Sequence, residues 1–200
     1  SGPGRQRAVR PETFKTDHTM KPSIAFIGGG NMARSIIGGL LKQGFDKSSL
    51  HVSEPHAPTR EALARELAID VGDDNLQVAG NGDVWLFAVK PQVMKAVCAQ
   101  LRGLAQQRRP LILSIAAGIT GGQLDAWLGG GLPVIRIMPN TPALLGAGAS
   151  GLFANGVVDE RQKRLAEQLF RATGLCTWVE SEALMDTVTA LSGSGPAYVF

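Results

Sequence analysis

The chain has 200 residues, of which 44% are hydrophobic and 18% charged, and a formal net charge of +3 at pH 7. These values are typical of a soluble globular protein with room for one full domain and the start of another. No basic stripe with interleaved aromatic residues indicates nucleic acid as a partner. No apolar run approaches the roughly 20 residues that would span a membrane, so we expect no membrane partner either.

Residues 1–20 precede the first predicted strand and are polar. Residues 1–19 hold four basic side chains against two acidic ones, and so supply most of the net positive charge. Early Gly and Pro residues and the lack of apolar periodicity are typical of disorder. We therefore expect a disordered tail, or an added extension upstream of Met20.

Strands and helices alternate along the rest of the chain. Short apolar runs between turn residues predict strands at 23–27, 50–53, 84–89, 111–115, 134–138, 151–154 and 176–179, with a weaker one at 69–71. Helical periodicity follows most of them, at 32–41, at 59–67, from Pro91 with Val93, Met94, Val97 and Leu101 on one face, at 120–128 and at 159–173. This alternation predicts an α/β fold with a doubly wound parallel sheet that is covered on both faces.

The stretch from Glu180 to Phe200 breaks this rhythm. Leu184, Val188 and Leu191 share one helical face, which needs an apolar partner. We therefore expect one domain over residues 21–181, and at 182–200 the truncated beginning of a second, all-α domain.

A glycine-rich turn joins the first strand to the first helix. The run Gly28-Gly29-Gly30-Asn31-Met32-Ala33 has the G-x-G-x-x-A spacing of a dinucleotide-binding turn. In that interpretation Gly28 permits the tight turn, Gly30 lets the backbone approach a pyrophosphate, and Ala33 permits close packing of helix on strand. A ligand-free glycine turn is the alternative. The strand directly before the motif and the helix directly after it favour a Rossmann-type, nucleotide-binding domain.

An acidic residue follows the second predicted strand. Glu54 lies 21 residues after Ala33, where a Rossmann domain places an acid against the adenosine ribose. A carboxylate there favours NAD(H) because it repels a 2′-phosphate, whereas His56 and Arg60 lie near enough to meet one. The alternative is that Glu54 is only a solvated turn residue, so cofactor preference stays open.

Three further strand ends carry candidate site residues. "AVKP" (Ala88–Pro91) contains Lys90, which is either catalytic or, as we favour, a solvated residue at a helix start. "SIAAGIT" contains Ala116, Ala117 and Gly118, whose small side chains leave room for a flat ring. Asn140 in "RIMPNTP" is either a loop residue or a side-chain amide for cofactor or substrate.

The remaining reactive side chains show no catalytic pattern. Cys98 and Cys176 lie in apolar stretches, as buried thiols of a reducing cytoplasm do. No Cys or His spacing predicts a metal site, and no Ser–His–Asp set or paired carboxylates stand out.

Five motifs together resemble the pyrroline-5-carboxylate reductase family: "FIGGGNMA", "AVKPQ", "SIAAGIT", "MPNTPALLGAGASG" and "LSGSGPAYVF". The similarity runs from about Lys21 to Phe200. The resemblance implies a Rossmann domain that binds NADP(H) or NAD(H), followed by a helical dimerisation domain. It also implies reduction of 1-pyrroline-5-carboxylate to L-proline, the last step of proline biosynthesis, by a homodimer or larger homo-oligomer. The pattern of Cys98 and Cys176 favours a cytoplasmic location.

The resemblance places cofactor contacts on fifteen residues of this chain: Ile27, Gly28, Gly29, Gly30, Asn31, Met32, Glu54, Asn75, Ala88, Val89, Lys90, Pro91, Ala116, Ala117 and Gly118. It assigns no catalytic side chain, which suits hydride transfer to a protonated imine, an electrophile that needs no strong general acid. Glu54 departs from the serine of many members, and the family's substrate loop is absent here. The alternatives are a reductase of another imine or of a hydroxy acid, and a non-catalytic dinucleotide-binding module.

Overall fold

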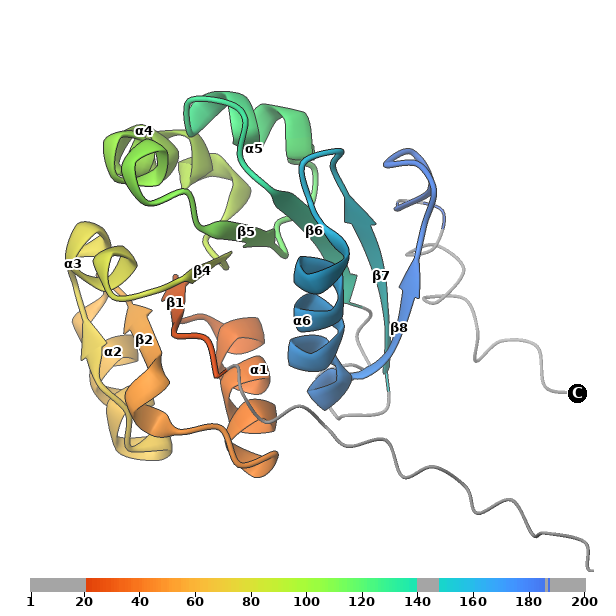
Figure 1. Cartoon of the computed structure of the whole chain (residues 1–200). Helices are drawn as coiled ribbons and strands as arrows, with labels where there is room; N and C mark the ends of the chain where they lie inside the picture. The colour runs from red at the N-terminus through yellow and green to blue at the C-terminus, as the bar shows by residue number, and fades with distance from the viewer. Residues whose placement is uncertain (1–20, 140–147, 186, 188–200) are drawn as a thin grey trace, which may run out of the picture.

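A single eight-stranded sheet forms the centre of the computed structural model, which describes residues 21–139, 148–185 and 187. The strand order is β3-β2-β1-β4-β5-β6-β7-β8, and helices cover both faces (Figure 1). The strands are β1 (Ile24–Ile27), β2 (Leu50–Ser53), β3 (Val71–Gly72), β4 (Val84–Phe87), β5 (Leu111–Ser114), β6 (Val134–Pro139), β7 (Gly148–Ala154) and β8 (Gly174–Trp178). The predicted α/β, doubly wound, Rossmann-type fold is confirmed.

Two apolar layers hold the helices against the sheet. The helical segments are α1 (Asn31–Lys42), η1 (Lys47–Ser49), α2 (Ala57–Leu67), α3 (Asn75–Gly80), α4 (Pro91–Arg108), α5 (Gly121–Trp127), α6 (Glu160–Phe170) and η3 (Arg171–Thr173). Ile24 and Phe26 of β1 face α1, α2 and α6, whereas Ala25 and Ile27 face α3, α4 and α5. Because all four side chains are fully buried, β1 is a continuous apolar run without alternation.

The sequence predicts a parallel sheet, but one pair of neighbouring strands is antiparallel. β7 runs antiparallel to β6, with Ile137 opposite Leu152, while all the other neighbouring pairs are parallel. The reason is the length of the connection, since only eight residues separate Pro139 from Gly148. A parallel crossover needs a dozen or more.

Two helical features differ from the sequence-based expectation. The short helix α3 was not predicted, and Asp74 begins it by accepting hydrogen bonds from the backbone N–H groups of Leu76 and Gln77. On α4 the buried face consists of Met94, Cys98, Leu101 and Ala105. Val93 was placed on that face but is 47% exposed.

Several expectations fall on residues that the structure leaves undescribed. These are the disordered tail (1–20), Asn140 and the motif Ser192–Tyr198. The domain boundary near residue 181 and the start of an all-α dimerisation domain also stay predictions. Of the expected second domain, residues 182–185 and 187 are described, and Leu184, Met185 and Thr187 have helical backbone.

We expect the Cys98 thiol to be unreactive in the native protein. It is fully buried on α4, and burial raises its pKa to about 12. The thiolate is the reactive form, so at pH 8 only about one Cys98 thiol in 10⁴ is ionised. Labelling with 5,5′-dithiobis(2-nitrobenzoate) at pH 8 should therefore modify Cys98 only after addition of guanidinium. Complete labelling of Cys98 in native protein within minutes would contradict this assignment.

Candidate dinucleotide-binding site

The glycine turn between β1 and α1 packs closely against the connection that follows β4. Gly28 has φ +105°, and a Cβ built on it would lie 2.8 Å from the carbonyl carbon and oxygen of Ala88. Its N–H donates to the carbonyl oxygen of Ser53 at the end of β2. No L-residue fits this conformation and this space, so Gly28 lets the ends of three adjacent strands meet.

Gly30 has a different property from Gly28. It is the N-cap of α1 with φ −68° and ψ −175°, an extended conformation open to any residue. Among the described residues, a Cβ at Gly30 would meet no neighbouring atom within 4 Å. No side chain caps the first turn of α1 and no acidic residue lies in it, so its N–H groups and the positive end of its dipole face open space. Such a helix end suits a phosphate.

Glu54 is tied to this glycine turn. One carboxylate oxygen accepts the N–H of Gly29 at 3.0 Å, and the other accepts the N–H of His56 at 2.9 Å. Nη1 of Arg60 donates to the carbonyl oxygens of Glu54 and Pro55. Glu54 is thus partly buried and bonded, in contrast to the alternative of a solvated turn residue.

Asn75 lies near the same edge, but its side chain is engaged within the protein. Its Oδ1 accepts from the hydroxyl of Ser53, and its Nδ2 donates to Gln100 Oε1 at 3.1 Å. The Asn75 side chain therefore links the end of β2 to α4 through hydrogen bonds.

The other predicted residues follow the next two strands. Ala88, Val89, Lys90 and Pro91 connect β4 to α4, and the exposed Lys90 is the N-cap of α4. After β5, Ala116 is buried while Ala117 and Gly118 are exposed. Since β2, β1, β4 and β5 are parallel neighbours, all four connections lie at one edge, and the chain order reverses between β1 and β4. Ligands of open α/β sheets bind at this switch point.

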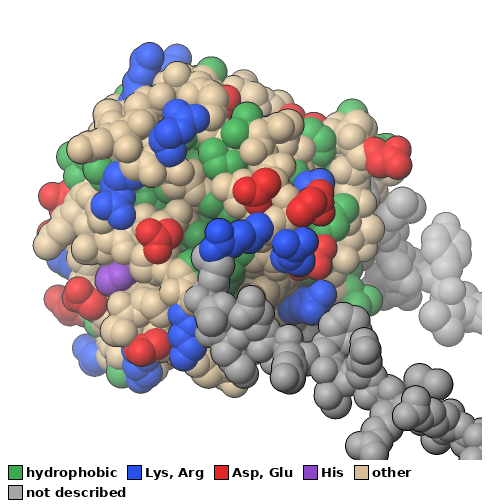
Figure 2. Space-filling model, viewed as in Figure 1, with side chains coloured by type: hydrophobic (Ala, Val, Ile, Leu, Met, Phe, Trp, Pro, Cys, Tyr) green, Lys and Arg blue, Asp and Glu red, His purple; other side chains and the backbone are tan. Residues whose placement is uncertain are grey.

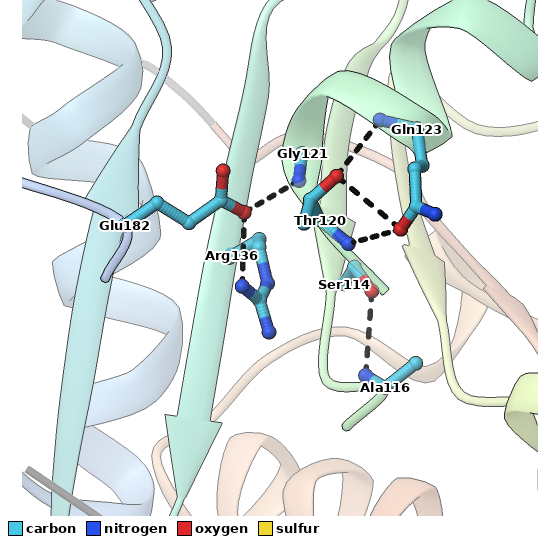
Figure 3. Close-up of polar contacts among 7 residues, drawn as sticks. All are labelled: Ser114, Ala116, Thr120, Gly121, Gln123, Arg136 and Glu182. Carbon is cyan, nitrogen blue, oxygen red and sulfur yellow. Dashed lines mark hydrogen bonds and ion pairs between the residues drawn. The ribbon is translucent and has the colours of Figure 1, made fainter. Parts of the chain in front are cut away.

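An ion pair that sequence analysis missed lies beside this edge (Figure 3). Arg136 on β6 is 5% exposed, and its Nη1 lies 2.9 Å from Oε1 of Glu182. The same oxygen accepts the N–H of Gly121, the first residue of α5, at 2.6 Å. The available signal was the arginine within the apolar strand "VIRIM", because buried charges are nearly always paired.

The described surface adds little to these site assignments. On the face shown in Figure 2, Lys and Arg side chains are interspersed with Asp and Glu, and form no basic stripe. A groove of about 400 Å³ lies at the amino ends of β4 and β5, between Lys21 and Arg109, away from the predicted site residues. The described residues contain no group of three or more His, Cys, Asp or Glu side chains that could hold a metal ion. Nor does any helix among them have both the length and the apolar character to cross a bilayer.

Comparison with known proteins gives two kinds of match. Residues 23–118 match the family described as "NADP oxidoreductase coenzyme F420-dependent". The pyrroline-5-carboxylate reductase of Pseudomonas aeruginosa is 52% identical over 181 residues, which cover 90% of this chain and 65% of that protein. By sequence, the chain belongs to the pyrroline-5-carboxylate reductase family. The resemblance stated from the five motifs is confirmed.

Solved structures agree with this family assignment. A pyrroline-5-carboxylate reductase from Coxiella burnetii has a TM-score of 0.84 at 44% identity, covering 88% of this chain and 66% of that one. The Plasmodium falciparum enzyme, solved with NADP bound, has a TM-score of 0.75 at 26% identity, covering 88% and 64%. A prephenate dehydrogenase at 13% identity shares the fold alone. The chain spans just under two thirds of the first curated relative's length.

Proposed function

We propose that the protein reduces 1-pyrroline-5-carboxylate to L-proline with NAD(P)H, the last step of proline biosynthesis. The observation that carries this proposal is the 52% identity to a reductase of that name across 90% of the chain. The uncapped start of α1 at Gly30 supports a dinucleotide there, because its geometry suits a pyrophosphate and none of the described residues lies within 4 Å of the position of a Gly30 Cβ.

When bound, NAD(P)H supplies the hydride. In this proposal the residues of the chain hold and orient the dinucleotide. Gly28–Gly30 and the start of α1 receive the pyrophosphate, and Glu54 faces the adenosine ribose. The connections Ala88–Pro91 and Ala116–Gly118 lie toward the nicotinamide. Lys90 is exposed at a helix start, so we assign it no catalytic role.

Location and assembly belong to the same proposal. Cys98 and Cys176 are free thiols, which suits a reducing cytoplasm. The family resemblance supports a homodimer or larger homo-oligomer, with the contacts in the helical segment expected after residue 181.

We expect NADPH or NADH oxidation, followed at 340 nm, to depend on added 1-pyrroline-5-carboxylate. The chain spans about 65% of the Pseudomonas relative, so turnover is expected from the protein that carries the remaining segment. Residues 1–200 alone should bind cofactor without turnover, because nothing described here is placed to hold the substrate carboxylate. Equal turnover by residues 1–200 would place the substrate site within them. Oxidation only with other imines or hydroxy acids would reject the assigned substrate.

A further inference from the structure

Glu182 joins three parts of the chain that are far apart in sequence. Its Oε1 accepts from Nη1 of Arg136, 46 residues away, and from the N–H of Gly121, 61 residues away (Figure 3). Glu182 stands four residues beyond the end of β8, where the chain leaves the sheet. One carboxylate oxygen therefore fixes the path of the departing chain.

The burial of Arg136 makes this attachment strong. Its side chain is 6% exposed, whereas that of Glu182 is 25% exposed. Its strand neighbours Ile135 and Ile137 are fully buried. A buried guanidinium requires a nearby negative charge, and among the described residues Glu182 is the acid within ion-pair distance. The departing chain thus supplies a charge that the sheet needs.

Gly121, the second partner of Glu182, is the first residue of α5. A capping box between Thr120 and Gln123 stabilises this N-terminus of α5. Two residues, Ile119 and Thr120, separate Gly121 from the predicted cofactor contacts Ala116–Gly118. Three residues after Glu182, Met185 is fully buried and its N–H donates to the carbonyl oxygen of Glu182. The departing chain is therefore held by the ion pair of Glu182 and by the burial of the Met185 side chain.

We propose that Glu182 is a positioning residue, which sets the chain beyond β8 against the β5–α5 connection and hence against the dinucleotide site. This inference rests on the proposed function. Hydride transfer needs the two reacting carbons about 3–3.5 Å apart, so a loosened junction should lower the rate without weakening cofactor binding.

The test compares Glu182→Ala, Glu182→Gln and Glu182→Asp with Glu180→Ala in the intact protein. Glu180 is an exposed acid two residues earlier, so it controls for loss of charge. We expect Glu182→Ala to lower kcat at least about tenfold, with the Kd for NADPH unchanged within about twofold. Glu182→Gln keeps an oxygen that can accept both N–H groups but removes the counter-charge of Arg136, so its kcat should fall between those of Glu182→Ala and wild type. Glu180→Ala should match wild type.

Glu182→Asp keeps the counter-charge of Arg136 but is one methylene shorter, so it serves if Glu182→Ala does not fold. Its kcat should also fall while its melting temperature stays near that of wild type. Wild-type kcat in every Glu182 variant would overturn the inference, and so would a parallel loss of NADPH affinity. A wild-type protein that oxidises no NADPH with 1-pyrroline-5-carboxylate would instead reject the proposed function, and the inference with it.

Discussion

Replacement of Gly30 by valine is expected to abolish dinucleotide binding and to leave the fold intact. Gly30 has extended backbone angles, and a Cβ there would lie within 4 Å of no atom in the part of the chain that the structure describes, so valine meets no clash with those residues. Its branched side chain would instead stand where a phosphate approaches the first turn of α1. We expect the Kd for NADPH and NADH to rise at least about 100-fold, equivalent to about 2.8 kcal/mol of binding free energy.

Gly38→Val is a matched control for this substitution. Gly38 lies on the same helix, two turns from the proposed site, and its Cβ would also face open space. Titration calorimetry should give wild-type affinity for Gly38→Val and no measurable heat for Gly30→Val at millimolar cofactor. Circular dichroism should show that both variants are folded. A Kd for Gly30→Val within threefold of the wild-type value would show that the pyrophosphate does not bind at the start of α1.

Local sequence was sufficient to predict the site edge. Buried parallel strands are apolar on both faces, so β1, β2, β4 and β5 were visible as short apolar runs, and the residues that follow them could be named. The glycine spacing then predicted a phosphate site at the end of β1. These features depend on neighbouring residues, and the structure brings the predicted strand ends to one edge.

Three features of the structure were not predicted, each for a different reason. The direction of β7 depends on the short connection after β6, and not on any pattern within either strand. Helix α3 has six residues, too few for a clear periodicity, and it is stabilised by the side chain of Asp74. The pair of Arg136 and Glu182 is separated by 46 residues, so neither sequence position indicates its partner.

Glu54 is expected to set the preference between NADH and NADPH. The hydrogen bonds of its carboxylate decide which substitution is a suitable test. Serine would remove the acceptor of the Gly29 N–H, which is buried in the glycine turn, and would disturb binding of both cofactors. Glutamine can keep that hydrogen bond through its amide oxygen. The N–H of His56 would lose its carboxylate acceptor, but His56 is exposed, so this N–H can donate to water instead. Glu54→Gln therefore removes the charge with little change to the loop.

A carboxylate beside the adenosine ribose accepts from its hydroxyl groups and repels a 2′-phosphate. Glu54→Gln should therefore raise the affinity for NADPH relative to NADH by about tenfold, or about 1.4 kcal/mol. The measurement is the ratio of the two Kd values at low and at high salt, because repulsion between charges near the surface weakens as salt screens it. Glu61→Gln removes an exposed charge from α2 and should leave the ratio unchanged. If Glu54→Gln also leaves it unchanged, the carboxylate of Glu54 serves only the glycine turn, and cofactor choice lies with other residues.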